Sequence, residues 1–301
     1  MNRKVAEVAG RRLSLSNLEK DLYPSYGFTK AHVLEYYRRV ATFILPHLKD
    51  RALTLKRYPD GVEKEFFFEK RCPSHRPSWV TTTEIPQDDG EWMTVCLVND
   101  LNTLIWVENL ASLELHVPLA RADSPETPDS MVFDLDPGDQ AGLLDCARVA
   151  LILRDLLSQL RLASYVKTSG KKGLHVYVPL NRKEPTFEET KKFSKAVAEV
   201  LQHNYPDLVT AKMAKELRKK KVFINWSQND SSKTMICVYS LRAREKPIVS
   251  FPLAWKELEN LTGQNDPEKL QVIHSEAVTR AEKNGDLFRE MITKKQKLPH
   301  V

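Results

Sequence analysis

Apolar residues recur every three or four positions in four stretches of this chain, and that spacing predicts amphipathic helices. The helices are expected over residues 29–49, 100–110, 141–161 and 186–204, followed by a mostly helical C-terminal part. Thr29 is a suitable N-cap for the first helix, and Pro46 should kink its last turn. The apolar positions of that helix are Val33, Tyr37, Val40, Ile44 and Leu48.

Short runs rich in β-branched and aromatic residues predict strands between these helices. The runs cover residues 52–58, 65–70, 79–85, 92–98, 113–118, 131–136, 164–168, 174–180, 221–226 and 234–240. This order predicts a mixed α/β (α+β) fold with β-hairpins, because no regular βαβ repeat is present. A segment rich in Pro, Asp and Ser at 121–130 predicts a boundary between residues 1–122 and 123–301 within a single domain.

The predicted strand 131–136 carries two carboxylates, Asp134 and Asp136, inside an apolar run that ends at Pro137 and Gly138. Residues two apart in a strand point to the same face, so the two carboxylates converge. Each raises the pKa of the other unless a cation lies between them. Mg²⁺ and Mn²⁺ prefer such oxygen ligands, together with water and phosphate. The alternative is a strand end whose acids face water, which is the commoner outcome for an isolated D-x-D.

The composition is that of an ordinary globular protein, with 42% hydrophobic and 29% charged residues among 301. No apolar run approaches the ~20 residues of a membrane span, and the N-terminus lacks a secretory signal, so we expect a cytoplasmic protein. The four cysteines are scattered, which predicts reduced and mostly buried thiols. Cys72 and His75 have a metal-like spacing, but no second pair completes a zinc site.

The net charge is +6, and basic residues cluster at 212–221. A charge run is usually a solvated face, but one that precedes a strand with metal-site candidates favours a polyanionic partner. Two more segments suit phosphate binding. Ser169, Lys172 and His175 surround the turn in TSGKKGLH, and Arg242 and Arg244 follow a strand in VYSLRAR. Hairpin turns and surface ion pairs are the alternatives for each taken alone.

Taken together, the motifs FDLDPG, TSGKKGLH and VFINWSQN resemble the polymerase domain of the bacterial and archaeal non-homologous end-joining ligases, within the archaeo-eukaryotic primase superfamily. The resemblance extends from LSNLEKDLYP near the start to SFPLAWKEL near residue 258, and it implies a stand-alone form of that domain. It implies mixed sheets flanked by helices, with an active-site cleft between two subdomains. It also implies template-directed nucleotidyl transfer by two metal ions, Mn²⁺ or Mg²⁺, with ribonucleoside triphosphates preferred.

The resemblance assigns roles to residues in both parts of the chain. Asp134 and Asp136 correspond to the first two metal-binding aspartates. The positions that hold the incoming nucleotide are His116, Ser169, Lys172 and Arg242, and a mobile basic loop near the primer terminus includes Lys215 and Arg218. The positions for the downstream 5′-phosphate are Asn17, Lys20 and Lys30. The rest of the DNA-binding face comprises Arg57 and the template-stacking rings of Phe67 and Phe68.

Several of these residues have simpler interpretations. At least one of Phe66, Phe67 and Phe68 should be a core residue, because neighbouring strand positions face opposite sides. His116 and His175 each lie between apolar residues, as structural histidines do. Lys20 and Lys30 have the character of surface lysines.

One position departs from the family pattern. The family's third metal-binding carboxylate lies in VFIDWSQN, and this chain has Asn225 there. An amide is a weaker, neutral ligand for a hard dication, so the metal that activates the primer 3′-hydroxyl should suffer most. We therefore expect a chain that binds DNA ends and nucleotide but transfers nucleotides poorly, whether Asn225 is natural or engineered.

Three functions remain open from the sequence. The first is a nucleoid-associated primase-polymerase that fills gaps at 5′-phosphorylated breaks, with a Ku-like end-binding partner. Because no K-x-D-G ligase motif is present, a separate DNA ligase would seal the nick. The second is a catalytically silent module that binds or bridges DNA ends. The third is a two-metal nuclease, against which the triphosphate-suited residues Ser169, Lys172 and Arg242 argue.

Overall fold

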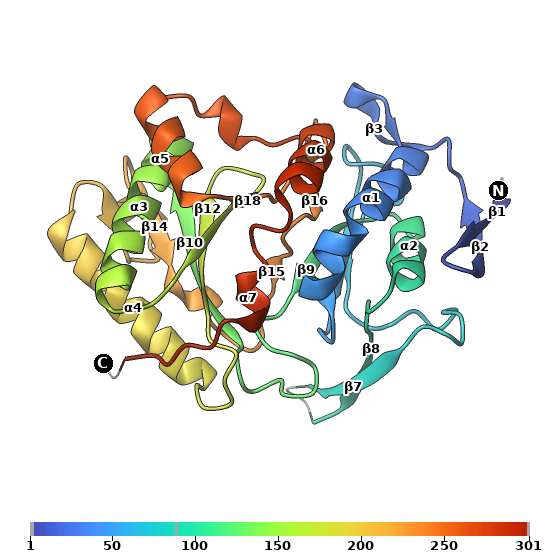
Figure 1. The fold of residues 1–301 in the computed structure, drawn as a ribbon, viewed down its shortest axis with the longest axis horizontal. Helices are drawn as coiled ribbons and strands as arrows, with labels where there is room; N and C mark the ends of the chain where they lie inside the picture. The colour runs from blue at the N-terminus through green and yellow to red at the C-terminus, as the bar shows by residue number, and fades with distance from the viewer. Residues whose placement is uncertain (1–2, 88–89, 300–301) are drawn as a thin grey trace. The chain divides into compact units, whose positions relative to one another are not determined.

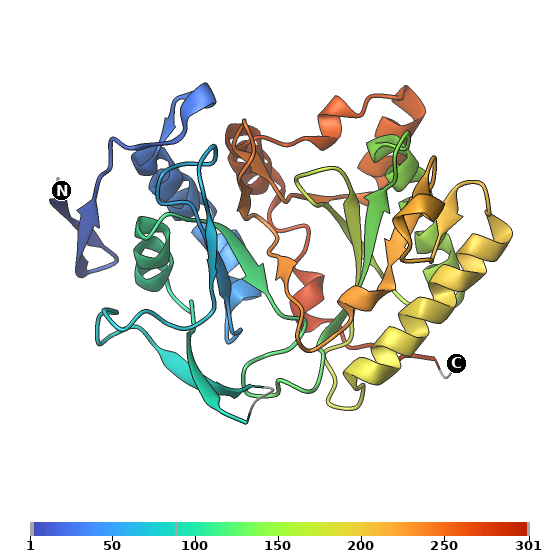
Figure 2. The same cartoon turned by 180° about the vertical axis from the view of Figure 1, so that it is seen from behind.

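The structure is a computed structural model that describes residues 3–87 and 90–299. It divides into two compact units built from non-contiguous segments (Figures 1 and 2). Unit 1 comprises the described residues up to Pro118, together with Ile236–Ser250 and Ile273–Gly285. Unit 2 comprises Leu119–Met235, Phe251–Val272 and the described residues from Asp286 onward.

Unit 2 is built on a six-stranded sheet with the order β13-β14-β10-β12-β11-β18. Only β13 and β14 pair in parallel; the other neighbours are antiparallel. The strands are β10 (Ser130–Pro137), β11 (Tyr165–Thr168), β12 (Leu174–Pro179), β13 (Val209–Thr210), β14 (Val222–Asn225) and β18 (Pro252–Leu253). Both edges of β10 are paired and most of it is buried, which explains its nearly continuous apolar run.

Four helices accompany this sheet: α3 (Leu143–Gln159), α4 (Phe187–Asn204), α5 (Trp255–Gln264) and α7 (Glu290–Thr293) (Figure 1). α3 packs on β10, β12 and β14 through its buried residues, among them Val149, Leu153 and Leu157. α4 begins with a capping box in which Thr186 and Glu189 satisfy each other's backbone N–H groups. Short 3₁₀ turns, η2 (Lys215–Arg218) and η3 (Trp226–Gln228), flank β14.

Unit 1 contains a four-stranded sheet with the order β15-β9-β5-β6. These strands are β5 (Thr54–Arg57), β6 (Phe67–Glu69), β9 (Ser112–Val117) and β15 (Met235–Ile236). Two-stranded pairs form from β1 (Arg3–Val8) and β2 (Arg11–Ser16), β3 (Asp21–Tyr23) and β4 (Phe28–Thr29), β7 (Thr82–Pro86) and β8 (Trp92–Cys96), and β16 (Leu241–Arg242) and β17 (Ile248–Val249). The helices are α1 (Lys30–Leu48), α2 (Leu101–Asn109) and α6 (His274–Asn284).

Buried tyrosines of α1 hold a later segment of the chain in unit 1. The Tyr36 hydroxyl donates to the Tyr239 carbonyl at 2.7 Å. The Tyr37 hydroxyl donates to the Leu113 carbonyl at 2.9 Å and accepts from the Leu241 N–H at 3.1 Å. Burial raises the pKa of both hydroxyls well above the ordinary value, so they stay neutral donors. These bonds give residues 236–250 their place in unit 1, which no local sequence pattern indicates.

The predicted mixed α/β fold is confirmed, and the four predicted helices are present within two residues of their expected ends. α1 runs through Pro46 to Leu48. The strand expected at 234–240 is wrong in length, because regular pairing ends at Ile236 and Tyr239 takes a left-handed backbone with φ 65°. None of the helices in the described ranges has the length and apolar content needed to cross a membrane.

The prediction for the cysteines was half wrong. Cys72 and Cys96 form a disulfide, with their Cα atoms 5.0 Å apart. The Cys72 N–H donates to the Thr94 carbonyl at 2.8 Å, which places the loop beside the end of β8. A separation of 24 residues carries no sequence signature of this contact. Cys146 and Cys237 are buried thiols, as expected.

Candidate active site

Asp134 lies at the centre of a row of polar side chains across the sheet of unit 2. On β10 it is in register with His175 of β12 and with Asn225 of β14. Directly opposite residues of antiparallel strands share a face, so the three side chains lie next to one another. Predicting the Asp134–Asn225 contact required the strand order, which the sequence alone does not provide.

The Asp134 carboxylate is buried and surrounded by hydrogen-bond donors. His175 Nε2 lies 3.4 Å from Oδ1, while Asn225 Nδ2 and Gln228 Nε2 donate to Oδ2 at 3.3 and 3.4 Å. Burial raises the pKa of Asp134, but the hydrogen bonds and charge of these donors outweigh it and hold the pKa below the ordinary value. Asp134 is therefore the ionised member of the pair.

Asp136 is the protonatable member of the pair. Burial and the adjacent Asp134 charge raise its pKa to about 7, against the opposing effect of Arg218. Near neutral pH Asp136 is thus about half protonated, and a dication that displaces this proton relieves the repulsion. The two carboxylates fit a Mg²⁺ or Mn²⁺ ion that takes its remaining ligands from water and phosphate.

Asn225 presents its amide to this pair as a donor. Its Nδ2 donates to Asp134, and its Oδ1 accepts from Ser227 Oγ at 2.8 Å. The Ser227 hydroxyl in turn accepts from Lys233 Nζ at 2.9 Å. In residues 3–87 and 90–299, no group of three or more His, Cys, Asp or Glu side chains is arranged to hold a metal ion. Asn225 thus adds no third carboxylate to Asp134 and Asp136.

The predicted basic loop contacts the turn after β10. A Cβ on Gly138 would collide with the Arg218 carbonyl oxygen, so only glycine permits this approach. The Lys220 N–H donates to the Asp139 carbonyl at 2.7 Å. The Arg218 guanidinium lies 3.7 Å from the centre of the Phe223 ring and donates to the Met213 carbonyl. The loop thus places Arg218 near Asp136, while Lys215 on η2 is exposed.

Ser169 organises the turn between β11 and β12. Its Oγ accepts from the N–H groups of Gly173 at 3.1 Å and Lys171 at 3.2 Å. A Cβ on Gly173 would collide with the Leu135 carbonyl oxygen, so the turn lies directly against β10. The Ser169 hydroxyl therefore shapes the loop that presents the exposed Lys172. Both residues lie in unit 2, with the aspartates.

The other two predicted nucleotide-binding residues, His116 and Arg242, meet in unit 1 through Glu114. Glu114 Oε2 lies 3.0 Å from His116 Nε2 and 3.2 Å from Arg242 Nη1, and Oε1 accepts from the Ala243 N–H at 3.1 Å. Arg242 is only 6% exposed, and its buried Nε has no hydrogen-bond partner among the described residues. This donor is buried as well as unpartnered, so an anion reaches it only after neighbouring side chains move.

Glu114 was missed by the sequence analysis. Burial raises its pKa, but the hydrogen bond from His116 and the charges of Arg242 and Lys56 outweigh that and lower the pKa to about 2. Burial lowers the pKa of His116, so the imidazole is neutral and donates through Nε2. Glu114 and His116 lie two residues apart on one strand, which indicates that their side chains share a face. That pattern does not identify Arg242 as the partner of Glu114, because Arg242 lies far away in the sequence.

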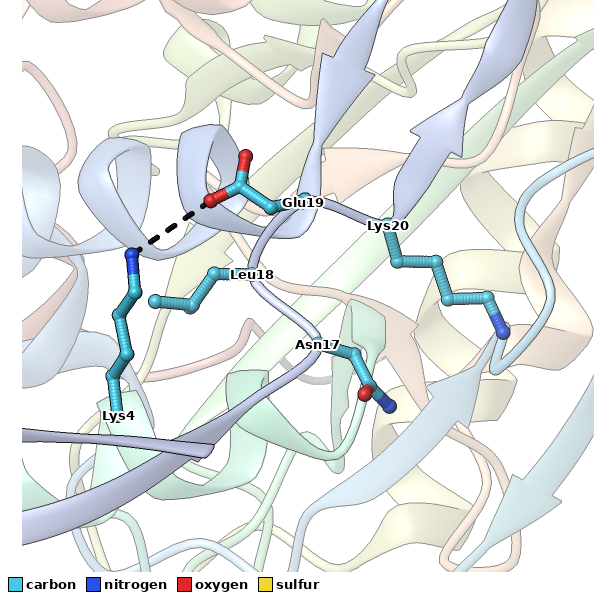
Figure 3. A pocket seen from close by; sticks show the side chains of 5 residues that line it. All are labelled: Lys4, Asn17, Leu18, Glu19 and Lys20. Carbon is cyan, nitrogen blue, oxygen red and sulfur yellow. Dashed lines mark ion pairs between the residues drawn. The ribbon is translucent and has the colours of Figure 1, made fainter. Parts of the chain in front are cut away.

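The predicted 5′-phosphate residues gather at the start of α1. Asn17 and Lys20 line a pocket of about 490 Å³ with Lys4, Leu18 and Glu19 (Figure 3). In Figure 3 the Lys4 side chain reaches toward Glu19, 3.9 Å away, while Lys20 extends elsewhere, to Asp60 at 2.5 Å.

Lys30 lies outside the lining of that pocket but next to it. Its N–H donates to the Lys20 carbonyl at 2.8 Å, and its Nζ donates to Ser16 Oγ at 3.3 Å. Burial, Arg57 and Lys20 lower the pKa of Lys30 to about 8. Lys30 is therefore a buried cation among cations, not the surface lysine of the simpler interpretation.

The expectation that one of Phe66, Phe67 and Phe68 lies in the core is wrong. Their exposed fractions are 48%, 44% and 58%. They do alternate: Phe66 and Phe68 pack edge to face, whereas Phe67 lies under the Arg57 guanidinium. All three stay exposed because β6 is an edge strand of the sheet.

Comparison with known proteins places the chain among the primase-polymerases. Residues 29–288 match the family model described as the LigD primase-polymerase domain, so the chain belongs to that family. It is 42% identical to the multifunctional non-homologous end joining protein LigD of Mycolicibacterium smegmatis, over 92% of this chain and 36% of that protein. It is 34% identical to the bifunctional LigD of Bacillus subtilis, over 83% of this chain and 40% of that protein.

A solved structure extends the match to the fold. The polymerase domain from Mycobacterium tuberculosis Ligase D in complex with DNA superposes with a TM-score of 0.87 at 38% identity, covering 95% of this chain and 99% of that chain. The present chain thus spans a whole polymerase domain but only 36–40% of the two full-length relatives described above.

Replacing the buried carboxylate of Glu114 should destabilise unit 1. Glu114→Gln leaves Arg242 without its counter-charge, so we expect a loss of about 3 kcal/mol in the free energy of unfolding at pH 7, measured by urea denaturation. In the folded state the pKa of Glu114 is lowered to about 2. Its contribution to the free energy of unfolding is therefore complete above the ordinary pKa of a glutamate and disappears as the pH falls through 2. The control Glu282→Gln, in an exposed pair with Arg39, should change stability by less than about 1 kcal/mol. Equal losses in the two variants would contradict the role of Glu114.

Metal binding should depend on pH through Asp136. Below its pKa of about 7, a metal ion must displace a proton, so Mn²⁺ affinity should fall about tenfold per pH unit and level off above pH 7. Calorimetric titration between about pH 6 and pH 8 measures this. Asp136→Asn should bind Mn²⁺ far more weakly, whereas Asp139→Asn, at an exposed position, should keep the wild-type profile. A flat profile for the wild type would rule out a proton on Asp136 near neutral pH.

Proposed function

We propose that this chain is a DNA end-joining primase-polymerase. It would add nucleotides, with ribonucleotides preferred, to a primer 3′-hydroxyl opposite a template, at gaps and breaks that carry a 5′-phosphate. The observation that carries the proposal is the Asp134–Asp136 pair, whose geometry and raised Asp136 pKa suit a dication in a family of primase-polymerases. The DNA complex of the Mycobacterium tuberculosis domain supports DNA as the substrate.

The metal chemistry would be centred on β10. Asp134 and Asp136 would hold Mn²⁺ or Mg²⁺, which when bound neutralises triphosphate charge and, in a two-ion site, activates the attacking hydroxyl. Asp134 is kept ionised by His175, Asn225 and Gln228, so it is ready to bind a cation at neutral pH. Arg218 adds a positive charge close to Asp136 on the side of the basic loop.

Each unit, taken by itself, contains candidate residues for binding the nucleotide. Ser169 shapes the turn that presents Lys172, and the buried Arg242 offers its unpartnered Nε to a phosphate oxygen. His116, fixed by Glu114 in a neutral form, would contact the sugar or base. Because Glu114 contacts both His116 and Arg242, it fixes these two side chains relative to each other before the nucleotide binds.

The DNA would be held by unit 1. Burial lowers the pKa of Lys30 most, and repulsion from Arg57 and Lys20 lowers it further; an incoming 5′-phosphate would relieve that repulsion. Phe67 and Phe68 are exposed and available to stack on template bases. A Ku-like end-binding protein and a separate DNA ligase are the expected partners, in a cytoplasmic, nucleoid-associated setting.

A second function is favoured by the orientation of Asn225. Its amide donates to Asp134 and its oxygen is engaged by Ser227, so it supplies no third carboxylate. A chain with this arrangement would bind DNA ends and nucleotide without completing transfer, and would act as an end-binding or bridging module.

Restoring the carboxylate should separate the two functions. In single-turnover primer extension on a gapped, 5′-phosphorylated duplex with Mn²⁺, Asn225→Asp should react at least about tenfold faster than the present chain, because a second ion gains a charged ligand. Asn204→Asp adds the same charge at an exposed position and should leave the rate unchanged. No incorporation by Asn225→Asp would support the binding module and contradict the polymerase.

A further inference from the structure

A second pocket of unit 1 lies beside the β1–β2 hairpin and has a volume of about 470 Å³. Arg3 and Arg12 line it from the hairpin, His75 and Trp79 from the loop before β7, and Trp106 from α2. None of the described residues that line it is acidic. Cationic forks beside aromatic rings suit a ligand with phosphates and flat bases, which is the chemistry of a nucleic-acid strand.

The register of the hairpin directs its polar side chains to one side. Arg12, Ser14 and Ser16 alternate along β2, and Arg3 lies directly opposite Ser16, so the four share a face. All four line the pocket. Glu7 lies opposite Arg12, so one arginine has a carboxylate neighbour and the face keeps a net positive charge.

The walls of the pocket are fixed by contacts of their own. Asn109 at the end of α2 accepts from the Ser16 N–H at 3.0 Å and donates to the Ser14 carbonyl at 3.2 Å. The Arg11 guanidinium lies 4.7 Å from the centre of the Trp79 ring. The hairpin is therefore held against α2 and the Trp79 loop, and the pocket is formed before any ligand arrives.

This pocket adjoins the cationic cluster around Lys30. Ser16, which lines it, accepts from Lys30 Nζ at 3.3 Å, and the next residue, Asn17, lines the pocket of Figure 3. We propose that the pocket holds the nucleotides that follow the 5′-phosphate on the same DNA strand. Arg12 and Arg3 contact backbone phosphates there, and Trp79 contacts a base. The proposal rests on the proposed function, since it takes the Lys30 cluster as the site of the terminal phosphate.

The test compares variants on gapped duplexes with a 5′-phosphate or a 5′-hydroxyl on the downstream strand, using fluorescence anisotropy. Arg12→Ala should weaken binding about five- to tenfold and reduce the slope of log affinity against log salt by about one. It should keep the wild-type preference for the 5′-phosphate, whereas Lys30→Ala should lose that preference. Trp79→Ala should weaken binding about tenfold. Arg289→Ala, an exposed arginine of unit 2, is the matched control and should bind as the wild type does.

A neutral backbone linkage locates the contact. A methylphosphonate at the first or second linkage after the 5′-phosphate should weaken binding by the wild type but not by Arg12→Ala. The proposal is overturned if Arg12→Ala binds like Arg289→Ala, or if the neutral linkage weakens both proteins equally. Equal binding of 5′-phosphate and 5′-hydroxyl DNA by the wild type is a separate result, which refutes the terminal-phosphate site itself and the proposal with it.

Discussion

Electrostatic repulsion between two carboxylates on one strand face is the constraint on which the candidate site of unit 2 depends. Asp134 and Asp136 point the same way because a strand repeats every two residues. The sheet stabilises the charge of only one of them, through donors from β12, β14 and η3. The other therefore holds its proton to about pH 7. A cation is the group that best completes this arrangement, and the family to which the chain belongs suggests the chemistry that the cation serves.

In unit 1 the clustered charges are positive, whereas the two close charges of the unit 2 site are carboxylates. Cations accumulate there, and one buried carboxylate, Glu114, orders two of the groups that we assign to the nucleotide. Burial, Arg57 and Lys20 lower the pKa of Lys30 to about 8. A site with several cations close together binds anions readily, because the negative charge of the ligand offsets the repulsion between those cations. The hairpin pocket with Arg3 and Arg12 extends that positive surface.

Local sequence patterns predicted helices α1–α4, strands β5–β12 and β14, and the Asp134–Asp136 pair, since these depend on periodicity along one segment. They missed β1–β4, β13 and β16–β18. They did not predict contacts that need the strand order or distant segments. Asn225 comes beside Asp134 through β14, Arg242 reaches Glu114 from more than a hundred residues away, and Cys72 meets Cys96 across a loop. At least one of Phe66, Phe67 and Phe68 was expected in the core, because alternation was applied without knowing that β6 is an edge strand. Lys20 and Lys30 carried no signal except the family resemblance.

Asn225 stands where the family pattern has an aspartate. This difference decides how many metal ions the site is expected to hold. The Asn225 amide donates to Asp134, so the site keeps two carboxylates, and we propose that these two hold a single metal ion strongly. The direct measurement is the number of Mn²⁺ ions bound per chain in the presence of DNA and a non-hydrolysable nucleoside triphosphate, counted by titration or by anomalous scattering in a crystal. We predict one ion, held by Asp134 and Asp136. Two fully occupied ions would contradict this account.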